Sequence, residues 1–394
     1  MPLVNMKQML EHAHRNGYVV GAFDLVSLDF LEGIITAAER CQAPVILSLA
    51  ESHFDYFDFD LAMPAVVAAA ERADVPVAIH LDHGHSLESA VHGINRGCNG
   101  VMVDASHLAF GENVAVTREV VEMARGCGVP VEGELGYVPG VEGEDAERHP
   151  CEIAYTSVED ARTFVQETGV DFLAVSIGTV HGRMQGEPRL DIARLQAIDE
   201  ALGIPLVIHG GTGLSDQQFR RLIERGVSKI NYYTALADAA GNRIAGNLGS
   251  DARGYTSLVK GVREAIADEV ERCIRLWGGH GRAGEVLEQS EPWLPVEHLI
   301  LYNVKGLDEA GVEAMMREGR RVLSGIPGVL AVDTGRAVKA DAGYRYCWRI
   351  RFCHPAVIDS YREHPDHVRF ADGLFRPVAG ERISIDYQLF GDRA

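Results

Sequence analysis

The sequence predicts a (β/α)8 barrel that is followed by a small α+β domain. Residues 1–284 alternate short apolar stretches with helical stretches, the pattern of parallel strands covered by helices. Polar residues follow directly after several apolar stretches, where the catalytic groups of such barrels lie. A doubly wound sheet is the alternative, but residues 24–27 after the first strand lack the Gly-rich phosphate fingerprint of that fold.

Eight apolar stretches are expected to form the barrel strands, each bounded by turn or polar residues. These stretches are 19–24, 44–51, 76–85, 100–106, 129–136, 171–179, 205–212 and 227–234. The helices between and after them are expected at 27–41, 61–73, 87–96, up to about 125, 158–168, 192–202, 215–225 and in the segment up to 277.

Composition narrows the possible partners. The 394-residue chain has a net charge of −20, which argues against a nucleic-acid or anionic-membrane partner. Seven cysteines are scattered singly without a C-x-x-C pair, which indicates reduced thiols and a cytoplasmic protein. The N-terminus lacks the apolar core of a signal peptide, and no apolar run is long enough to span a bilayer.

Histidines and carboxylates gather at the predicted strand ends. His83 follows strand three, His181 strand six and His209 strand seven, so all three are expected on one face of the barrel. Three imidazoles with an open position are a catalytic zinc arrangement, although each histidine alone also fits a capping or packing role. The complete strand-end set is Asp24, Glu51, Asp82, His83, Asp104, Glu134, His181, His209 and Asn231.

A phosphate site is expected beside the histidines. The loops after strands seven and eight of such barrels bind phosphate with backbone amides and a helix N-terminus. Here these loops hold the Gly-rich run His209–Gly213 and the run Asn231–Thr234.

These motifs, in this order, resemble the class II, zinc-dependent ketose-bisphosphate aldolases of the fructose and tagatose type, with the tagatose branch nearest. The matching motifs are GAFD at 21–24, LDHG at 81–84, VMVDAS at 101–106, GELG at 133–136, IGTVHG at 177–182, HGGTG at 209–213, IN-x-x-T at 230–234 and WGGHGRA at 277–283.

The resemblance implies a role for each matched residue. His83, His181 and His209 would hold one zinc ion, Asp82 would be the acid/base at the C4 hydroxyl, and Asp104 and Glu134 would orient or briefly accept the metal. A flap glutamate, Glu142 in preference to Glu144, would shuttle a proton. Arg253 would reach a distal phosphate in a neighbouring subunit, and a monovalent cation (Na⁺ or K⁺) would lie near the phosphate. The residues implied at the phosphate and the dihydroxyacetone-phosphate part are Gly182, Gly210, Gly211, Thr212, Asn231, Tyr232, Tyr233 and Thr234.

The residues agree with metal-assisted retro-aldol chemistry. Such cleavage needs either a Lewis-acid metal or a lysine Schiff base. The chain has only five lysines, and Lys229 alone lies on a predicted barrel strand, so we interpret it as structural or as local positive charge. Asp24, Glu51 and the bulky pair Tyr232–Tyr233 depart from the family pattern and put the far half of the substrate in doubt.

A second domain is expected over 296–394 after a linker at 285–295. Its predicted order is strand, helix, strand, strand, helix, strand, a ferredoxin-like plan. The runs EHLILYNVK, YREHPDHVRF and SIDY resemble the stress-responsive α/β-barrel (Dabb) family, whose domains pair into dimers. We interpret His298, Tyr361, His364 and His367 as packing or capping residues, and expect the domain to set a dimeric or tetrameric state or to shield the barrel mouth.

The predicted function is a zinc-dependent aldolase acting on a small phosphorylated ketose. Two alternatives stay open. One is another metal-dependent barrel enzyme, such as an epimerase or an aldolase for a different ketose phosphate. The other is a non-catalytic binding or scaffold protein organised by the second domain.

Overall fold

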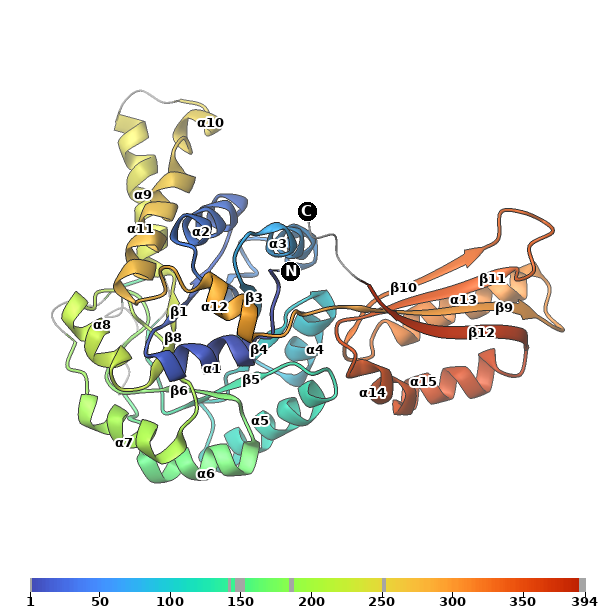
Figure 1. The fold of residues 1–394 in the computed structure, drawn as a ribbon, viewed down its shortest axis with the longest axis horizontal. Coiled ribbons are helices and arrows are strands. Elements are labelled where there is room, and N and C mark those ends of the chain that lie inside the picture. Colours follow the sequence, from blue (N-terminus) through green and yellow to red (C-terminus); the bar gives the residue numbers. More distant parts are fainter. Residues whose placement is uncertain (1, 141–142, 146–152, 184–187, 250–252, 390–394) are drawn as a thin grey trace.

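The computed structural model describes residues 2–140, 143–145, 153–183, 188–249 and 253–389. A closed barrel of eight parallel strands, in the order β1 to β8, confirms the predicted fold class (Figure 1). The strands are β1 Val20–Asp24, β2 Val45–Ala50, β3 Val77–Gly84, β4 Gly100–Val103, β5 Val131–Leu135, β6 Phe172–Val175, β7 Leu206–Ile208 and β8 Val227–Tyr232.

Helices surround the barrel because each strand is followed by a helical segment, and several of these helices begin at a capping serine. Ser86, Ser157 and Ser215 each accept a hydrogen bond from a backbone N–H of the first helical turn. The helices are α2 Leu28–Cys41, α3 Phe59–Arg72, α4 Leu87–Arg96, α5 Phe110–Arg125, α6 Val158–Thr168, α7 Ile192–Leu202, α8 Asp216–Ile223, α9 Thr234–Gly249, α10 Tyr255–Leu258 and α11 Val262–Leu276.

The N-terminal end of the barrel is closed by an apolar floor. Helix α1 (Met6–Asn16), which the sequence analysis did not anticipate, places Met6, Met9 and Leu10 in one buried cluster with inward-facing strand residues such as Val20 and Phe172. The barrel interior therefore has apolar side chains at one end and leaves its polar side chains for the carboxyl ends of the strands.

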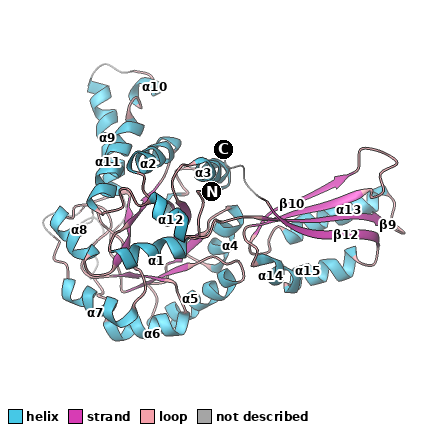
Figure 2. Cartoon of the chain, in the orientation of Figure 1, coloured by secondary structure: helices cyan, strands magenta, loops and turns pink. Residues whose placement is uncertain are grey.

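The second domain is a four-stranded antiparallel sheet in the order β10-β11-β9-β12 with helices on one face (Figures 1 and 2). Its elements are β9 Val296–Val304, α13 Glu309–Leu323, β10 Val329–Arg336, β11 Tyr346–Phe352, α14 Val357–Glu363, α15 Pro365–Phe370, a π-helical turn Ala371–Phe375 and β12 Ala379–Gln388. The first residues of the expected linker belong to a short helix, α12 Ala283–Gln289. Val286 of this helix packs against the apolar floor of the barrel.

The two domains meet through a hydrogen-bonded contact at the end of α4. The Asn95 side chain donates to the carbonyls of Ser324 (3.2 Å) and Ile326 (3.1 Å) and accepts from the Gly328 N–H (2.8 Å). Ser360 Oγ donates to the Gly126 carbonyl (2.8 Å) at the end of α5. Since the barrel helices end beside the strand N-termini, the second domain docks away from the barrel mouth and does not shield it in its own chain.

Among the described helices, none combines the length and the apolar character that crossing a bilayer requires.

Candidate active site

The end of β3 turns two consecutive side chains towards the barrel mouth. Neighbouring residues of a regular strand point to opposite faces. Here the pairing of β3 with β4 shifts between Leu81 and Gly84, and His83 adopts a left-handed φ of 46°. This conformation costs a non-glycine residue roughly 1–3 kcal/mol and is typical of functional sites. It brings His83 Nε2 to 4.0 Å from the Asp82 carboxylate.

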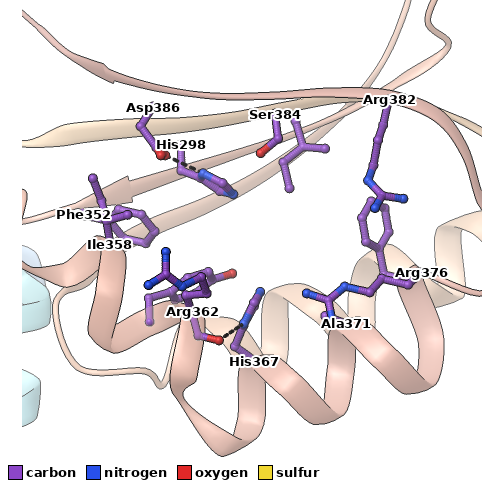
Figure 3. A pocket seen from close by; sticks show the side chains of 13 residues that line it. His298, Phe352, Ile358, Arg362, His367, Ala371, Arg376, Arg382, Ser384 and Asp386 are labelled. Atoms are coloured by element: carbon purple, nitrogen blue, oxygen red, sulfur yellow. Dashed lines mark hydrogen bonds and ion pairs between the residues drawn. The ribbon is translucent and has the colours of Figure 1, made fainter.

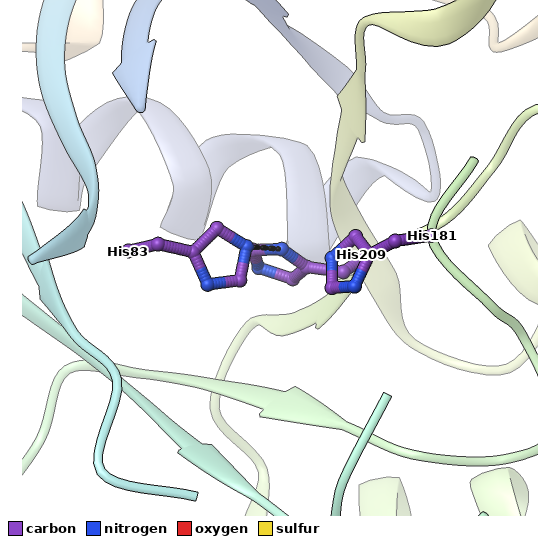
Figure 4. Close-up of side chains that lie close together, drawn as sticks. All are labelled: His83, His181 and His209. Carbon is purple, nitrogen blue, oxygen red and sulfur yellow. Dashed lines mark hydrogen bonds between the residues drawn. The ribbon is translucent and has the colours of Figure 1, made fainter. Parts of the chain in front are cut away.

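The three predicted metal ligands converge (Figure 4). Ligand nitrogens of His83, His181 and His209 lie within 4.8 Å of one another. His83 Nε2 is 3.0 Å from His209 Nδ1, close to the roughly 3.3 Å between two nitrogens on one tetrahedral zinc ion. The structure therefore brings together three histidines that lie far apart in the sequence, one at the end of β3 and two in the loops after β6 and β7.

Each imidazole is fixed through its other nitrogen. His83 Nδ1 contacts Asp104 Oδ2 at 2.8 Å, His209 Nε2 contacts Glu132 Oε1 at 3.0 Å, and His181 Nδ1 contacts the Val138 carbonyl at 3.1 Å. This pairing with an oxygen acceptor is the usual way in which proteins orient metal-binding histidines. His181 Nε2 is buried without a hydrogen-bond partner among the described residues, so the three remaining nitrogens fit a single cation.

Glu132 is the functional residue that sequence reasoning missed. Its second oxygen lies 2.7 Å from Lys229 Nζ, and both side chains are fully buried. Burial opposes ionisation, but the lysine ammonium and the His209 contact lower the pKa of Glu132 to about 2. The sequence signal for Glu132 is its spacing of two residues from Glu134. Alternate residues of a strand point to the same face, so both carboxylates point into the barrel. Lys229 thus has the structural role that the sequence predicted.

Asp104 and Glu134 form a second potential cation group with His83. Burial and the neighbouring Asp104 raise the pKa of Glu134 well above its ordinary value. Burial opposes ionisation of Asp104 too, but the contact with His83 and two hydrogen bonds from Ser106 hold its pKa far below the usual range. The surroundings therefore shift the pKa values of these two carboxyls in opposite directions.

Asp82 and Asn231 are buried polar side chains whose hydrogen-bonding atoms can accept hydrogen bonds from, or donate them to, a bound ligand. Both carboxylate oxygens of Asp82 and both amide atoms of Asn231 have no hydrogen-bond partner among the described residues. Burial alone would raise the pKa of Asp82, but the facing His83, His209 and Lys229 hold it below its usual range. Asp82 is therefore an ionised base at the mouth.

The loops after β7 and β8 approach neighbouring backbone closely. Gly210 has a φ of 71°, and a Cβ there would lie 2.2 Å from the Val180 carbonyl oxygen, so only glycine fits. Thr212 Oγ1 accepts a hydrogen bond from the Ala235 N–H (3.3 Å). Thr234 Oγ1 accepts one from the Gly143 N–H (3.0 Å), which connects the β8 loop to the long loop after β5.

Arg183 provides a second anchor for the loop after β5, and the sequence analysis did not single it out. Its guanidinium donates to the Asp238 carboxylate (3.0 Å) and to the Gly143 carbonyl (2.8 Å). Arg183 and Thr234 therefore both hold Gly143, which lies in the middle of this loop. Glu142, the expected flap residue, lies outside the described residues.

Two side chains that were expected to contact a ligand, those of Tyr232 and Arg253, do not point into the barrel mouth of this chain. The Tyr232 side chain points out of the barrel, because β8 directs Asn231 inwards; its hydroxyl donates to Glu269 (2.9 Å) and its ring packs on Trp277. Only the Tyr232 backbone is available to a phosphate. Arg253 is exposed between α9 and α10, at the outer end of the helical pair that projects from the barrel (Figure 1).

The Tyr233 side chain lies at the edge of the mouth. Its ring centroid is 4.3 Å from that of His53, which follows β2, and 6.1 Å from that of Phe30. Of the two tyrosines that the sequence analysis singled out as bulky, only Tyr233 therefore borders the site, where its ring packs on His53.

Comparisons with known proteins agree with this geometry. The family model "Fructose-bisphosphate aldolase class-II" matches residues 4–282, and the model "Stress responsive A/B Barrel Domain" matches residues 296–389. The fructose-bisphosphate aldolase of Staphylococcus aureus is 38% identical over 288 residues, which are 72% of this chain and 100% of that protein. A probable fructose-bisphosphate aldolase of Bacillus subtilis has the same identity and coverage.

Solved structures show the same relationship. The YdjI aldolase of Escherichia coli K12 superposes with a TM-score of 0.65 at 33% identity, covering 71% of this chain and 99% of that one. A putative fructose-1,6-bisphosphate aldolase of Coccidioides immitis gives a TM-score of 0.63 at 31% identity, covering 70% and 97%. The chain therefore belongs to the class II fructose-bisphosphate aldolase family, a family of lyases that is generally metal-dependent, and carries a Dabb domain at its C-terminal end.

Proposed function

We propose that this chain is a zinc-dependent aldolase that reversibly cleaves a fructose- or tagatose-1,6-bisphosphate type ketose into dihydroxyacetone phosphate and an aldehyde. One observation carries the proposal. Three imidazoles, each anchored through its second nitrogen, direct their remaining nitrogens at one point beside the buried, ionised Asp82.

The residues divide the reaction between them. When bound to His83, His181 and His209, a zinc ion supplies a Lewis acid that polarises the ketose carbonyl. Asp82 accepts the C4 hydroxyl proton as the C3–C4 bond breaks, so the aldehyde forms at C4 and the bond's electron pair passes to the enediolate of the dihydroxyacetone-phosphate half. Protonation at C3 then completes that product, the step for which we propose Glu142.

Binding of the phosphate is assigned to backbone amides. Gly182, Gly210 and Gly211 let the chain approach an anion closely, and Thr212 and Thr234 add hydroxyls to the same loops. Asn231 reaches the dihydroxyacetone part from β8, and we place a Na⁺ or K⁺ ion near this phosphate. Arg253 is exposed at the end of a projecting helical pair, so we propose that it serves the distal phosphate of a neighbouring subunit.

The sheet of the second domain supports a homo-oligomer. Ile383, Ile385 and Tyr387 alternate along β12 and are 41–47% exposed on the face opposite the helices. An apolar strand face of this kind is typical of a protein interface. We expect light scattering to give a dimer or tetramer that Ile385→Glu dissociates; a monomeric wild-type chain would contradict this. We place the protein in the cytoplasm because its cysteines are scattered singly.

The test is cleavage of fructose 1,6-bisphosphate and tagatose 1,6-bisphosphate, measured as dihydroxyacetone phosphate released with and without chelator. We expect chelator-sensitive release that His181→Ala abolishes and that His92→Ala, at an exposed histidine of α4, leaves unchanged. The ratio of the two rates assigns the substrate branch. Release that persists with the chelator, or no release by zinc-loaded protein, would contradict the proposal.

A further inference from the structure

The second domain contains a cavity of its own, far from the barrel mouth. It has a volume of about 350 Å³ and lies between the inner face of the sheet and the helices α14 and α15 (Figure 3). Such a volume is within the range of small-molecule sites. The sequence analysis treated its histidines as packing or capping residues, which holds for His364, whose Nδ1 accepts the Asp366 N–H at 3.3 Å.

The interior of this cavity is lined by buried aromatic and aliphatic side chains. Phe352, Tyr361 and Phe375 line it and are buried, and the Phe352 and Tyr361 ring centroids are 4.9 Å apart. Ile300 of β9 and Ile358 of α14 complete the apolar lining. An apolar group of a ligand would therefore be removed from water there, which stabilises the complex.

The charged residues around the cavity are mostly positive. Arg362, Arg376 and Arg382 line it, whereas Asp386 is its only acidic lining residue among those that the structure describes. This local excess of positive charge contrasts with the net charge of −20 of the whole chain. Guanidinium groups are well suited to bind carboxylates and phosphates. An anionic group is therefore the complementary partner.

Two of these three arginines form ion pairs with acidic neighbours, and the third can pair with a bound anion. Arg362 pairs with Asp359 at 2.8 Å, and Arg376 pairs with Asp372. Arg382 of β12 has no acidic partner among the described residues. Figure 3 shows Arg382 and Arg376 extending from the sheet and from the helical side towards the same end of the cavity. His298 occupies the other end, with its Nδ1 2.6 Å from Asp386 Oδ1.

We propose that this cavity is a binding site for a small organic anion with an apolar body. The anionic group is bound by Arg382, and the apolar body lies on Phe352 and Phe375. The His298–Asp386 pair supplies a polar contact at the far end. The proposal does not depend on the aldolase reaction, because the site uses only residues of the second domain.

The experiment measures binding of octanoate to the full chain by isothermal titration calorimetry. Octanol serves as the neutral probe of the same length, and acetate as the anion without an apolar body. We expect octanoate to bind at one site per chain and at least tenfold more tightly than either of the other two. Binding of acetate or octanol as tight as that of octanoate, or no octanoate binding, would overturn the proposal.

Variants locate the site. Arg382→Gln is expected to weaken octanoate binding about tenfold or more through loss of a charge-assisted contact. Ser384→Phe, which fills the cavity from the same strand, is expected to abolish it. The matched control is Arg349→Gln, because Arg349 lies on the opposite face of the sheet and pairs with Asp333 at 2.6 Å. Equal octanoate affinity of wild type, Arg382→Gln and Ser384→Phe would overturn the assignment.

Discussion

The barrel mouth and the cavity of the second domain place their charged groups in opposite ways. At the mouth, Asp82, Glu132 and Lys229 are buried, and their charges are balanced by fixed neighbours. In the cavity, the arginines are exposed at the rim and the interior is apolar. Catalysis requires reacting groups that are fixed in position and shielded from water before the substrate binds, whereas binding requires only complementary charge and shape. The difference assigns catalysis to one region and recognition to the other.

The largest expected effect is on the cleavage rate, and it comes from replacing Asp82 at the barrel mouth. Asp82→Asn removes the base that we propose for the C4 hydroxyl, so cleavage is expected to slow by about 10²–10⁴-fold. Steady-state kinetics measure this, with Asp60→Asn as the control at an exposed carboxylate that pairs with Arg96. Octanoate binding to the second domain should not change. Full cleavage activity in Asp82→Asn would contradict the assignment.

The next effect concerns the stability of the mouth. Lys229→Met leaves Glu132 charged and buried without its ammonium partner, which is expected to cost about 3–5 kcal/mol of unfolding free energy. Urea denaturation measures this, and Lys339→Met, at an exposed lysine of the second domain, should be neutral. Adding Glu132→Gln should recover part of the loss. If Lys229→Met were as stable as wild type, the buried ion pair would not have the assigned role.

A smaller effect is expected on metal affinity. Glu132→Gln removes the negative charge that orients and polarises His209, and such outer contacts typically contribute 10–100-fold in metal affinity. Competition with a fluorescent zinc chelator measures it, with Glu119→Gln on the surface of α5 as the control. Zinc affinity equal to that of wild type would show that the Glu132–His209 contact does not tune the site.

The smallest effect is a change in pH dependence. His80 is fully buried, and burial together with Lys229 lowers its pKa to about 3, so the folded chain holds it neutral while the unfolded chain protonates it near 6.5. The unfolded state therefore binds the extra proton, and stability is lost as the pH falls from 6.5 towards 3. His80→Asn should reduce this slope by about 1.4 kcal/mol per pH unit. An unchanged slope in urea melts between pH 6 and pH 4 would contradict it.

The strand ends were predictable because their signal is local. A polar residue directly after an apolar run marks the mouth, and this rule located Asp82, His83 and His209 without any contact information. Glu132 was harder to identify, since it lies within a strand and only its spacing from Glu134 shows which face it takes. For Tyr232 the same spacing rule, applied from Asn231, would have predicted a side chain that points outwards.

Contacts between distant segments were not predictable. Asn95 joins the two domains through residues 229 to 233 positions away, and nothing in its helix indicates that role. Helix α1 closes the barrel floor through methionines that would also suit a surface helix of another fold. The cavity of the second domain depends on β12 bringing Arg382 to the side of Arg376, which only the sheet order reveals.

The central claim is that three histidines hold one catalytic zinc ion beside Asp82. The most direct measurement is titration of chelator-stripped protein with Zn²⁺, in which bound metal and dihydroxyacetone phosphate release are measured on the same samples. We expect both to rise together and to reach a plateau at one equivalent per chain, and both to be lost in His209→Ala. Cleavage by the stripped protein without added metal, or one tightly bound equivalent in His209→Ala, would contradict the account.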